Sequence, residues 1–108
     1  MKPRYLLRPK ADQDLDEHSF YLAQQGSPGA GHRFLVAAHE SFALLATQPE
    51  MGWHFRGKYP GTLGMRIFRV SGFERMLILY LPHTSGVEIL RIIHGSRDLS
   101  RILQRDTA

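Results

Sequence analysis

The sequence predicts an α+β fold in which a helical hairpin packs on a mostly antiparallel sheet, in the order β-α-α-β-β-β-α. Two observations lead to this prediction. The N-terminal half holds two amphipathic stretches joined by a short loop rich in Gly and Pro, and helices joined by so short a loop lie antiparallel. The C-terminal half holds three apolar runs separated by turn residues, which indicates a meander of strands.

The N-terminal segment predicts a strand followed by a helix. Residues 4–8 place a Tyr and two Leu between charges, and Pro9 closes them, which is typical of a strand. Acidic residues then crowd the range 11–17, where they meet the positive end of a helix dipole, so a helix begins there. The breaker residues 25–29 end this helix. The residues with helical spacing on its apolar stripe are Ala11, Leu15, His18 and Leu22.

A second, longer helix is predicted from Ala30 to about Thr47. Its end follows from Pro49, which disfavours helix at the residue before it, and from Gly52. Residues 53–64 contain three glycines and one proline without any period, so a loop is predicted. The apolar face of the helix consists of Phe34, Ala38, Phe42 and Leu45, widened by Leu35, Ala37 and Leu44.

Strands are predicted over 65–70, 75–81 and 87–94, and a short final helix over 98–105 with Asp98 as its N-cap. Alternation in the third strand places Val87, Ile89, Arg91 and Ile93 on one face, and apolar residues also occupy the other face, so this strand is predicted to be central. Alternation does not determine which strand faces point inward. The residues expected in one core are Leu15, Leu22, Phe34, Ala38, Phe42 and Leu45, packed against Ile67, Leu77, Leu79, Ile89 or their strand neighbours.

Composition excludes several classes of protein. The chain has 108 residues, which suits one domain spanning 1–108, because a second core is not expected below about 150 residues. It contains no cysteine, which excludes a disulfide scaffold, a thiolate zinc site and a cysteine nucleophile, and fits a reducing cytoplasm. No signal peptide is apparent, and the longest apolar stretch, 76–81, is far shorter than the roughly 20 residues of a membrane helix.

The C-terminal half is rich in arginine. The chain carries a net charge of +4, and eight of the nine cationic residues after residue 50 are Arg. The planar guanidinium suits phosphates and carboxylates, so an acidic partner, nucleic acid or protein, is expected; ordinary solubility charge is the alternative. The six histidines have no metal-ligand spacing with Asp or Glu, and acids beside His18 are expected to lie on a solvated helix face, so neither a metal nor another cofactor is predicted.

Several segments resemble the RelE/ParE superfamily of bacterial type II toxins. The resemblance is closest to the ParE type. The similar segments are residues 11–15, Phe34, residues 42–45, residues 49–52 and residues 91–99. The most specific is His94-Gly95-Ser96-Arg97-Asp98-Leu99, which looks like the HGxRDL ending common among ParE-type members. The resemblance covers nearly the whole chain and implies the same fold.

The ribonuclease branch of the superfamily implies a metal-independent cleavage of mRNA on the ribosome by basic side chains. Arg66, Arg75 and Arg97 fall at basic positions of that pattern, whereas Phe68 and Leu103 stand where a lysine and a tyrosine are expected. Arginine is a poor general base, so His94 is the candidate for that role. The alternative is a structural His94 bonded to backbone or to a nearby Asp, with Arg97 paired to Asp98.

The ParE branch implies inhibition of DNA gyrase by protein contact, without catalysis, and a hetero-oligomer with a ParD-like antitoxin that contributes an acidic or amphipathic segment. The HGxRDL-like ending and the missing ribonuclease positions favour this branch. A non-toxic nucleic-acid-binding module is a third hypothesis. The aromatic residues of 53–59 are expected either to stack on bases or to pin the loop to the core. The predicted target-binding residues are Arg66, Arg69, Arg75, Arg91 and Arg97.

Overall fold

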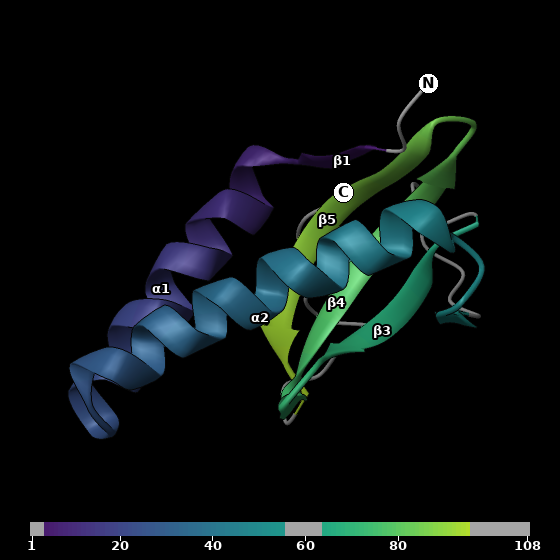
Figure 1. The fold of residues 1–108 in the computed structure, drawn as a ribbon. Helices are drawn as coiled ribbons and strands as arrows, with labels where there is room; N and C mark the ends of the chain where they lie inside the picture. Colours follow the sequence, from purple (N-terminus) through teal and green to yellow (C-terminus); the bar gives the residue numbers. More distant parts are fainter. Residues whose placement is uncertain (1–3, 56–63, 96–108) are drawn as a thin grey trace.

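A computed structural model describes residues 4–55 and 64–95 and confirms the α+β fold, with two helices on one face of a five-stranded sheet (Figure 1). The helix predicted over 98–105 lies outside the described residues. The elements are β1 (Arg4–Leu7), α1 (Pro9–Gln25), α2 (Pro28–Thr47), β2 (Trp53–His54), β3 (Arg66–Val70), β4 (Phe73–His83) and β5 (Gly86–His94).

The strands are arranged in the order β1-β5-β4-β3-β2. β1 pairs with β5 in parallel, and the other neighbours are antiparallel, so the sheet is mostly antiparallel as predicted. The position of β5 between β1 and β4 confirms the prediction of a central strand. The prediction of a loop throughout 53–64 is wrong at its start, because Trp53 and His54 pair with Ile67 and Arg66. Two residues are too short a strand to show an alternating pattern.

Both helices begin two residues earlier than their apolar patterns indicate. Each has a proline in its first turn, Pro9 in α1 and Pro28 in α2, where the missing N–H and the fixed φ of proline suit a helix start. Ser27 caps α2, since its Oγ accepts a hydrogen bond from the Ala30 N–H at 3.3 Å. Thr47 ends α2 as predicted.

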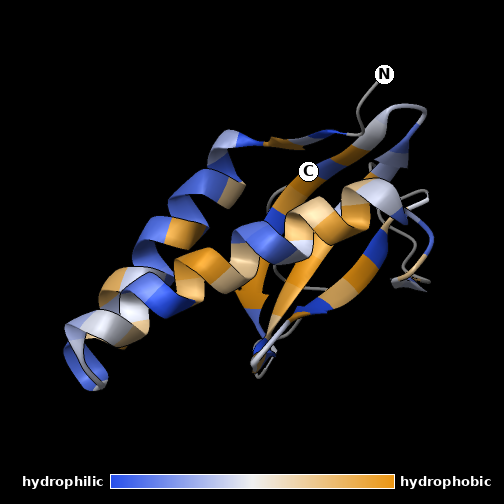
Figure 2. Ribbon diagram, viewed as in Figure 1, coloured by the Kyte–Doolittle hydropathy of each residue, from blue (hydrophilic) through white to orange (hydrophobic). Residues whose placement is uncertain are grey.

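The helices cover one face of the sheet, and apolar residues line both the inner side of the helices and the strands beneath them (Figure 2). Phe34, Phe42 and Leu45 are fully buried in this helix-facing cluster, which confirms the predicted helix face. The prediction of one core is wrong in part, because a second cluster is built on the opposite face of the sheet. It consists of Met65, Ile67, Leu79, Leu90 and Ile93, with Phe55, Leu77 and Leu81 beside it.

A register shift in the pairing of β4 and β5 changes which residues of β5 share a face. Leu79 pairs with Arg91 and Tyr80 pairs with Ile89, so Leu90 has no partner of its own. An inserted residue interrupts alternation along a strand. The placement of Ile89 and Ile93 on one face was therefore wrong: Ile89 lies in the helix-facing cluster and Ile93 in the opposite one. Among the described residues, neither helix is both long and apolar enough to cross a membrane.

Candidate functional site

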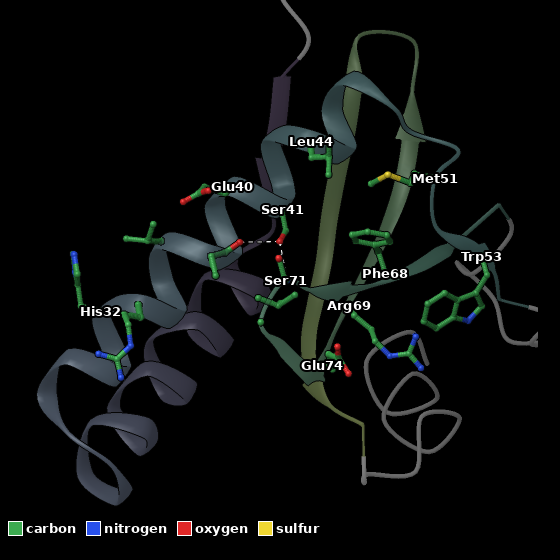
Figure 3. A pocket seen from close by; sticks show the side chains of 15 residues that line it. His32, Glu40, Ser41, Leu44, Met51, Trp53, Phe68, Arg69, Ser71 and Glu74 are labelled. Atoms are coloured by element: carbon green, nitrogen blue, oxygen red, sulfur yellow. Dashed lines mark hydrogen bonds between the residues drawn. The ribbon is translucent and has the colours of Figure 1, made fainter.

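An open groove of about 850 Å³ lies between α2 and the adjoining edge of the sheet (Figure 3). Val36 and Leu44 line it from α2, and each is 43% exposed. Phe68 projects into it from β3, and Met51 and Trp53 form its wall at one end. Trp53 is also 43% exposed. Three large apolar side chains of the groove, Val36, Leu44 and Trp53, are thus partly exposed, which indicates a surface that binds another molecule.

Charged groups surround this apolar groove. Arg33 and Glu40 of α2 lie on one side, and Arg69 and Glu74 lie on the other. The guanidinium carbon of Arg69 lies 5.1 Å from the centre of the Trp53 ring, within cation–π distance. The rim therefore presents an arginine and a glutamate at each side of an apolar floor, an arrangement that suits an amphipathic segment with acidic residues placed at the two arginines.

The edge of the sheet beside the groove is only partly paired. β2 pairs with Ile67 and Arg66 of β3, and no described strand pairs with the outer side of the range 68–70. Ser41 ties α2 to the end of β3, because its Oγ donates to the Ala37 carbonyl at 2.8 Å and accepts the Ser71 N–H at 3.3 Å. The end of the groove near Ser71 is thereby fixed, whereas the edge along 68–70 offers backbone groups to a partner.

Arg66 is bound to the segment that forms the groove wall. Its Nη1 donates to the Glu50 carbonyl at 3.0 Å and the Gly52 carbonyl at 2.6 Å, and its Nη2 donates to His54 Nε2 at 3.0 Å. Tyr80 holds the same segment from the core. Its hydroxyl donates to the Pro49 carbonyl at 2.8 Å and accepts the Gly52 N–H at 2.9 Å.

The buried position of Tyr80 also affects its ionisation. Burial raises the pKa of the Tyr80 hydroxyl above its ordinary value, and the Gly52 N–H and the Arg66 charge only partly oppose this shift. The hydroxyl is thus kept protonated, which its hydrogen bond to Pro49 requires.

The structure does not bring the predicted arginines together. Arg66 pairs with Tyr80 of the helix-facing cluster, whereas Arg69 pairs with Leu77, which packs on the opposite cluster. Since side chains alternate along β3, Arg66 and Arg69 leave the sheet on opposite faces, and Arg69 reaches the groove only at the sheet edge, where it lies over Trp53. Arg75 is exposed on β4, and Arg97 lies outside the described residues.

Arg91 forms a buried ion pair with Asp14. Its Nε lies 2.7 Å from Asp14 Oδ2 and its Nη2 3.1 Å from Asp14 Oδ1, and the two side chains are only 12% and 7% exposed. Asp14 also accepts the Ile92 N–H at 3.0 Å. One turn further along α1, His18 Nε2 donates to the Ile92 carbonyl at 2.8 Å. The two side chains of α1 therefore bond the edge of β5 as a strand would.

This arrangement corrects the expectation of a solvated helix face for Asp14 and His18, whereas Glu17 is exposed as expected. Asp14 is 5% exposed and His18 is 8% exposed, so both belong to the buried side of α1. The helical stripe that contains His18 was the signal, and Asp14 lies four residues before it on the same side. Within the described ranges, no group of three or more His, Cys, Asp or Glu residues is placed to hold a metal ion.

His94 and the ion pairs at the β1 edge do not line the groove. His94 is half-buried at the end of β5 and pairs with Met76 of the helix-facing cluster. At the β1 edge, Glu88 lies 2.6 Å from Arg8 and 3.1 Å from His83. The hydrogen bond from Arg8, supported by His83 and by both charges, lowers the pKa of the Glu88 carboxyl below its ordinary value against a smaller effect of burial.

The sequence reasoning missed the groove. Val36 and Leu44 lie eight residues apart, a spacing that keeps them on one side of a helix. Neither belongs to the buried stripe through Phe34 and Phe42, so the signal was a second apolar side on α2. The groove itself arises only when this side lies beside Phe68, Met51 and Trp53.

Comparison with known proteins identifies the family. A family model described as the ParE toxin of the type II toxin-antitoxin system parDE matches residues 5–99. The chain belongs to the ParE toxin family. A solved structure described as a chromosomal ParDE toxin-antitoxin system from P. aeruginosa is similar in fold, with a TM-score of 0.68 and 17% identity over 85% of this chain and 95% of that chain. No match was found among curated proteins.

Membership of the ParE toxin family confirms the resemblance inferred from the HGxRDL-like ending and assigns the chain to the type II toxins. The structural neighbour supports the same helical hairpin on a mostly antiparallel sheet. The groove and the arginines are therefore features of a ParE-type toxin.

Proposed function

We propose that this ParE-type toxin inhibits DNA gyrase in the cytoplasm by protein contact and without catalysis. The observation that carries the choice of target is the placement of Arg66. A ribonuclease of the related branch would use this guanidinium on RNA, but here two carbonyls and His54 bind it. Phe68, at the position of the expected lysine, packs on the helix-facing cluster.

The other candidate ribonuclease groups are also separated from Arg66. Arg66 pairs with Tyr80 and His94 pairs with Met76, four residues away along β4, which corresponds to about 13 Å at the usual rise of a strand. A general base and a phosphate-binding arginine must reach the same nucleotide. This separation supports gyrase over mRNA as the target and favours exposed residues such as Arg69 and Arg75 for the target contact.

The groove supports a ParD-like antitoxin as the second partner, in a hetero-oligomer with the toxin. An amphipathic segment would place apolar side chains against Val36, Leu44 and Phe68 and acidic ones near Arg33 and Arg69. Such a segment orders as it binds, and the complex would be more stable than the free toxin by linkage.

The decisive experiment incubates purified toxin with gyrase and plasmid, and in parallel with ribosomes and mRNA. We expect loss of supercoiling or accumulation of cleaved plasmid, with intact mRNA. Variants distinguish the mechanisms in a growth assay: His94→Gln retains toxicity if no proton transfer depends on it, whereas Arg75→Glu weakens it. Specific cleavage of ribosome-bound mRNA by the parent protein would contradict gyrase inhibition.

The antitoxin is tested with the protein encoded by the neighbouring small reading frame. Co-expression is expected to restore growth, and the purified pair is expected to form a complex that melts at a higher temperature than the toxin alone. A neighbouring protein that neither binds nor protects cells would remove the antitoxin from the proposal.

A further inference from the structure

The segment 49–54, which forms one wall of the groove, is held mainly by side chains from the sheet. Its backbone contributes the Met51 N–H to the Gln48 carbonyl at 3.0 Å and the short β2 pairing. Arg66 adds three hydrogen bonds and Tyr80 adds two, and together they bind the carbonyls of Pro49, Glu50 and Gly52.

These two side chains are suited to act as fixed supports. Tyr80 is fully buried, so its hydroxyl presents one donor and one acceptor from a rigid position in the core. The planar fork of Arg66 spans two carbonyls and a ring nitrogen at once, a geometry that the single ammonium of lysine does not reproduce.

The supported segment carries two side chains that the groove needs. Met51 and Trp53 alternate with the bonded residues and line the groove opposite Leu44 (Figure 3). The Arg69 guanidinium also lies over the Trp53 ring in a cation–π contact. The position of this wall is thus set by hydrogen bonds made behind it, on residues that do not line the groove themselves.

We propose that Arg66 and Tyr80 are positioning residues, which hold Met51 and Trp53 as a preformed wall for the antitoxin and touch neither the antitoxin nor the target. The inference rests on the proposed function for the identity of the partner. A partner that meets a preformed wall does not lose the free energy of ordering it, so the clamp formed by Arg66 and Tyr80 increases affinity without direct contact.

Trp53 is the only tryptophan of the chain, so its fluorescence reports directly on the wall. The variants are Arg66→Met, Arg66→Lys and Tyr80→Phe, with Arg4→Met as a control that removes one exposed arginine at the β1 edge. Acrylamide quenching is measured on each free toxin, below the onset of its thermal unfolding. We expect more efficient quenching in Arg66→Met and Tyr80→Phe, partial rescue in Arg66→Lys, and no change in Arg4→Met.

The second measurement is the affinity of each variant for the antitoxin encoded beside the toxin gene. We expect Arg66→Met and Tyr80→Phe to bind about tenfold more weakly, which corresponds to about 1.4 kcal/mol and to the ordering of about one residue. Weaker binding is expected only where quenching has increased.

The outcomes separate this inference from the proposed function. Unchanged Trp53 quenching in folded Arg66→Met and Tyr80→Phe would overturn the clamp, whatever the toxin binds. Loss of gyrase inhibition in Arg66→Met with unchanged quenching and unchanged antitoxin affinity would also overturn it, because Arg66 would then contact the target. Absence of antitoxin binding by the parent toxin would instead count against the proposed function, while increased quenching in the variants would still support the clamp.

Discussion

Replacement of Asp14 by Ala tests whether α1 completes the hydrogen bonding of β5. β1 pairs with β5 only as far as Ile89, and the next part of this edge is bonded by side chains of α1. The Asp14 carboxylate accepts three hydrogen bonds there, two from Arg91 and one from the Ile92 N–H. The replacement removes all three at a site where the Asp14 side chain is 7% exposed and that of Arg91 is 12% exposed.

The expected cost follows from this burial. Removal of one member of a buried ion pair costs about 3–5 kcal/mol, because the other charge stays in a medium that solvates it poorly. The Ile92 N–H loses its acceptor as well, and a buried unsatisfied donor costs about 1–3 kcal/mol. One carboxylate serves both groups, so the two costs overlap, and we expect about 3–5 kcal/mol in total. For a domain of this size this lowers Tm by about 12 °C or more.

Urea denaturation followed by far-ultraviolet circular dichroism measures the free energy of unfolding. Asp14→Asn is the matched control, since its amide oxygen still accepts the Ile92 N–H although the charge is lost, and an intermediate cost is expected. Addition of Arg91→Met to Asp14→Ala is expected to recover part of the stability, because the buried guanidinium that has lost the Asp14 carboxylate is then removed as well. A cost below about 1 kcal/mol for Asp14→Ala, typical of an exposed ion pair, would refute the reasoning.

Three further predictions concern the core and the β1 edge. Phe42→Ala is expected to cost about 3–5 kcal/mol because the ring is fully buried, while Leu44→Ala on the groove side costs much less; equal losses in urea denaturation would contradict the packing. The pKa of Glu88 is lowered in the folded state, so the stabilisation from its carboxylate is present above about pH 4.3 and is lost as pH falls through the folded pKa. As pH is lowered, Tm is expected to fall less steeply in Glu88→Gln than in the parent protein, and parallel curves would contradict this prediction. Gly86→Ala places a Cβ 1.7 Å from the Arg4 carbonyl oxygen and is expected to detach β1. A Cβ at Gly72 meets nothing within 4 Å, so Gly72→Ala carries only the strain of its φ of 78° and is expected to lower Tm less; similar Tm values for both variants would contradict this.

Local patterns predicted most of the fold. The apolar spacing through Phe34 and Phe42 identified α2 and its buried face, since a helix that packs on a sheet must repeat its apolar residues with the helical period. The turn residues between the apolar runs separated β3, β4 and β5 correctly, although β4 extends to His83 and β5 begins at Gly86, so the second turn is shorter than the sequence indicates. The faces of β5 could not be predicted, because the unpaired Leu90 depends on its register against β4 rather than on its own sequence.

The candidate site was less predictable than the fold. The many arginines of the C-terminal half predicted one cationic surface that binds the target. The structure instead places Arg66 behind the groove wall and Arg91 against Asp14. Both arginines stabilise carbonyl or carboxylate groups that become neighbours only after folding. The apolar side of α2 at Val36 and Leu44 was visible in the sequence, but it defines a groove only beside the sheet.

The backbone hydrogen bonds at the two edges of the sheet are therefore satisfied to different extents, and this difference indicates where a partner binds. On one side, β1 bonds the first half of β5, and Asp14 and His18 of α1 then take over at Ile92. On the other side, β2 pairs with only two residues of β3 and leaves the range 68–70 beside an apolar groove, within the part of the chain that the structure describes. Backbone groups and apolar side chains are thus available together at the groove. A segment that forms strand hydrogen bonds and buries apolar side chains would satisfy both, and for this reason we expect the antitoxin to bind this edge rather than the β1 edge.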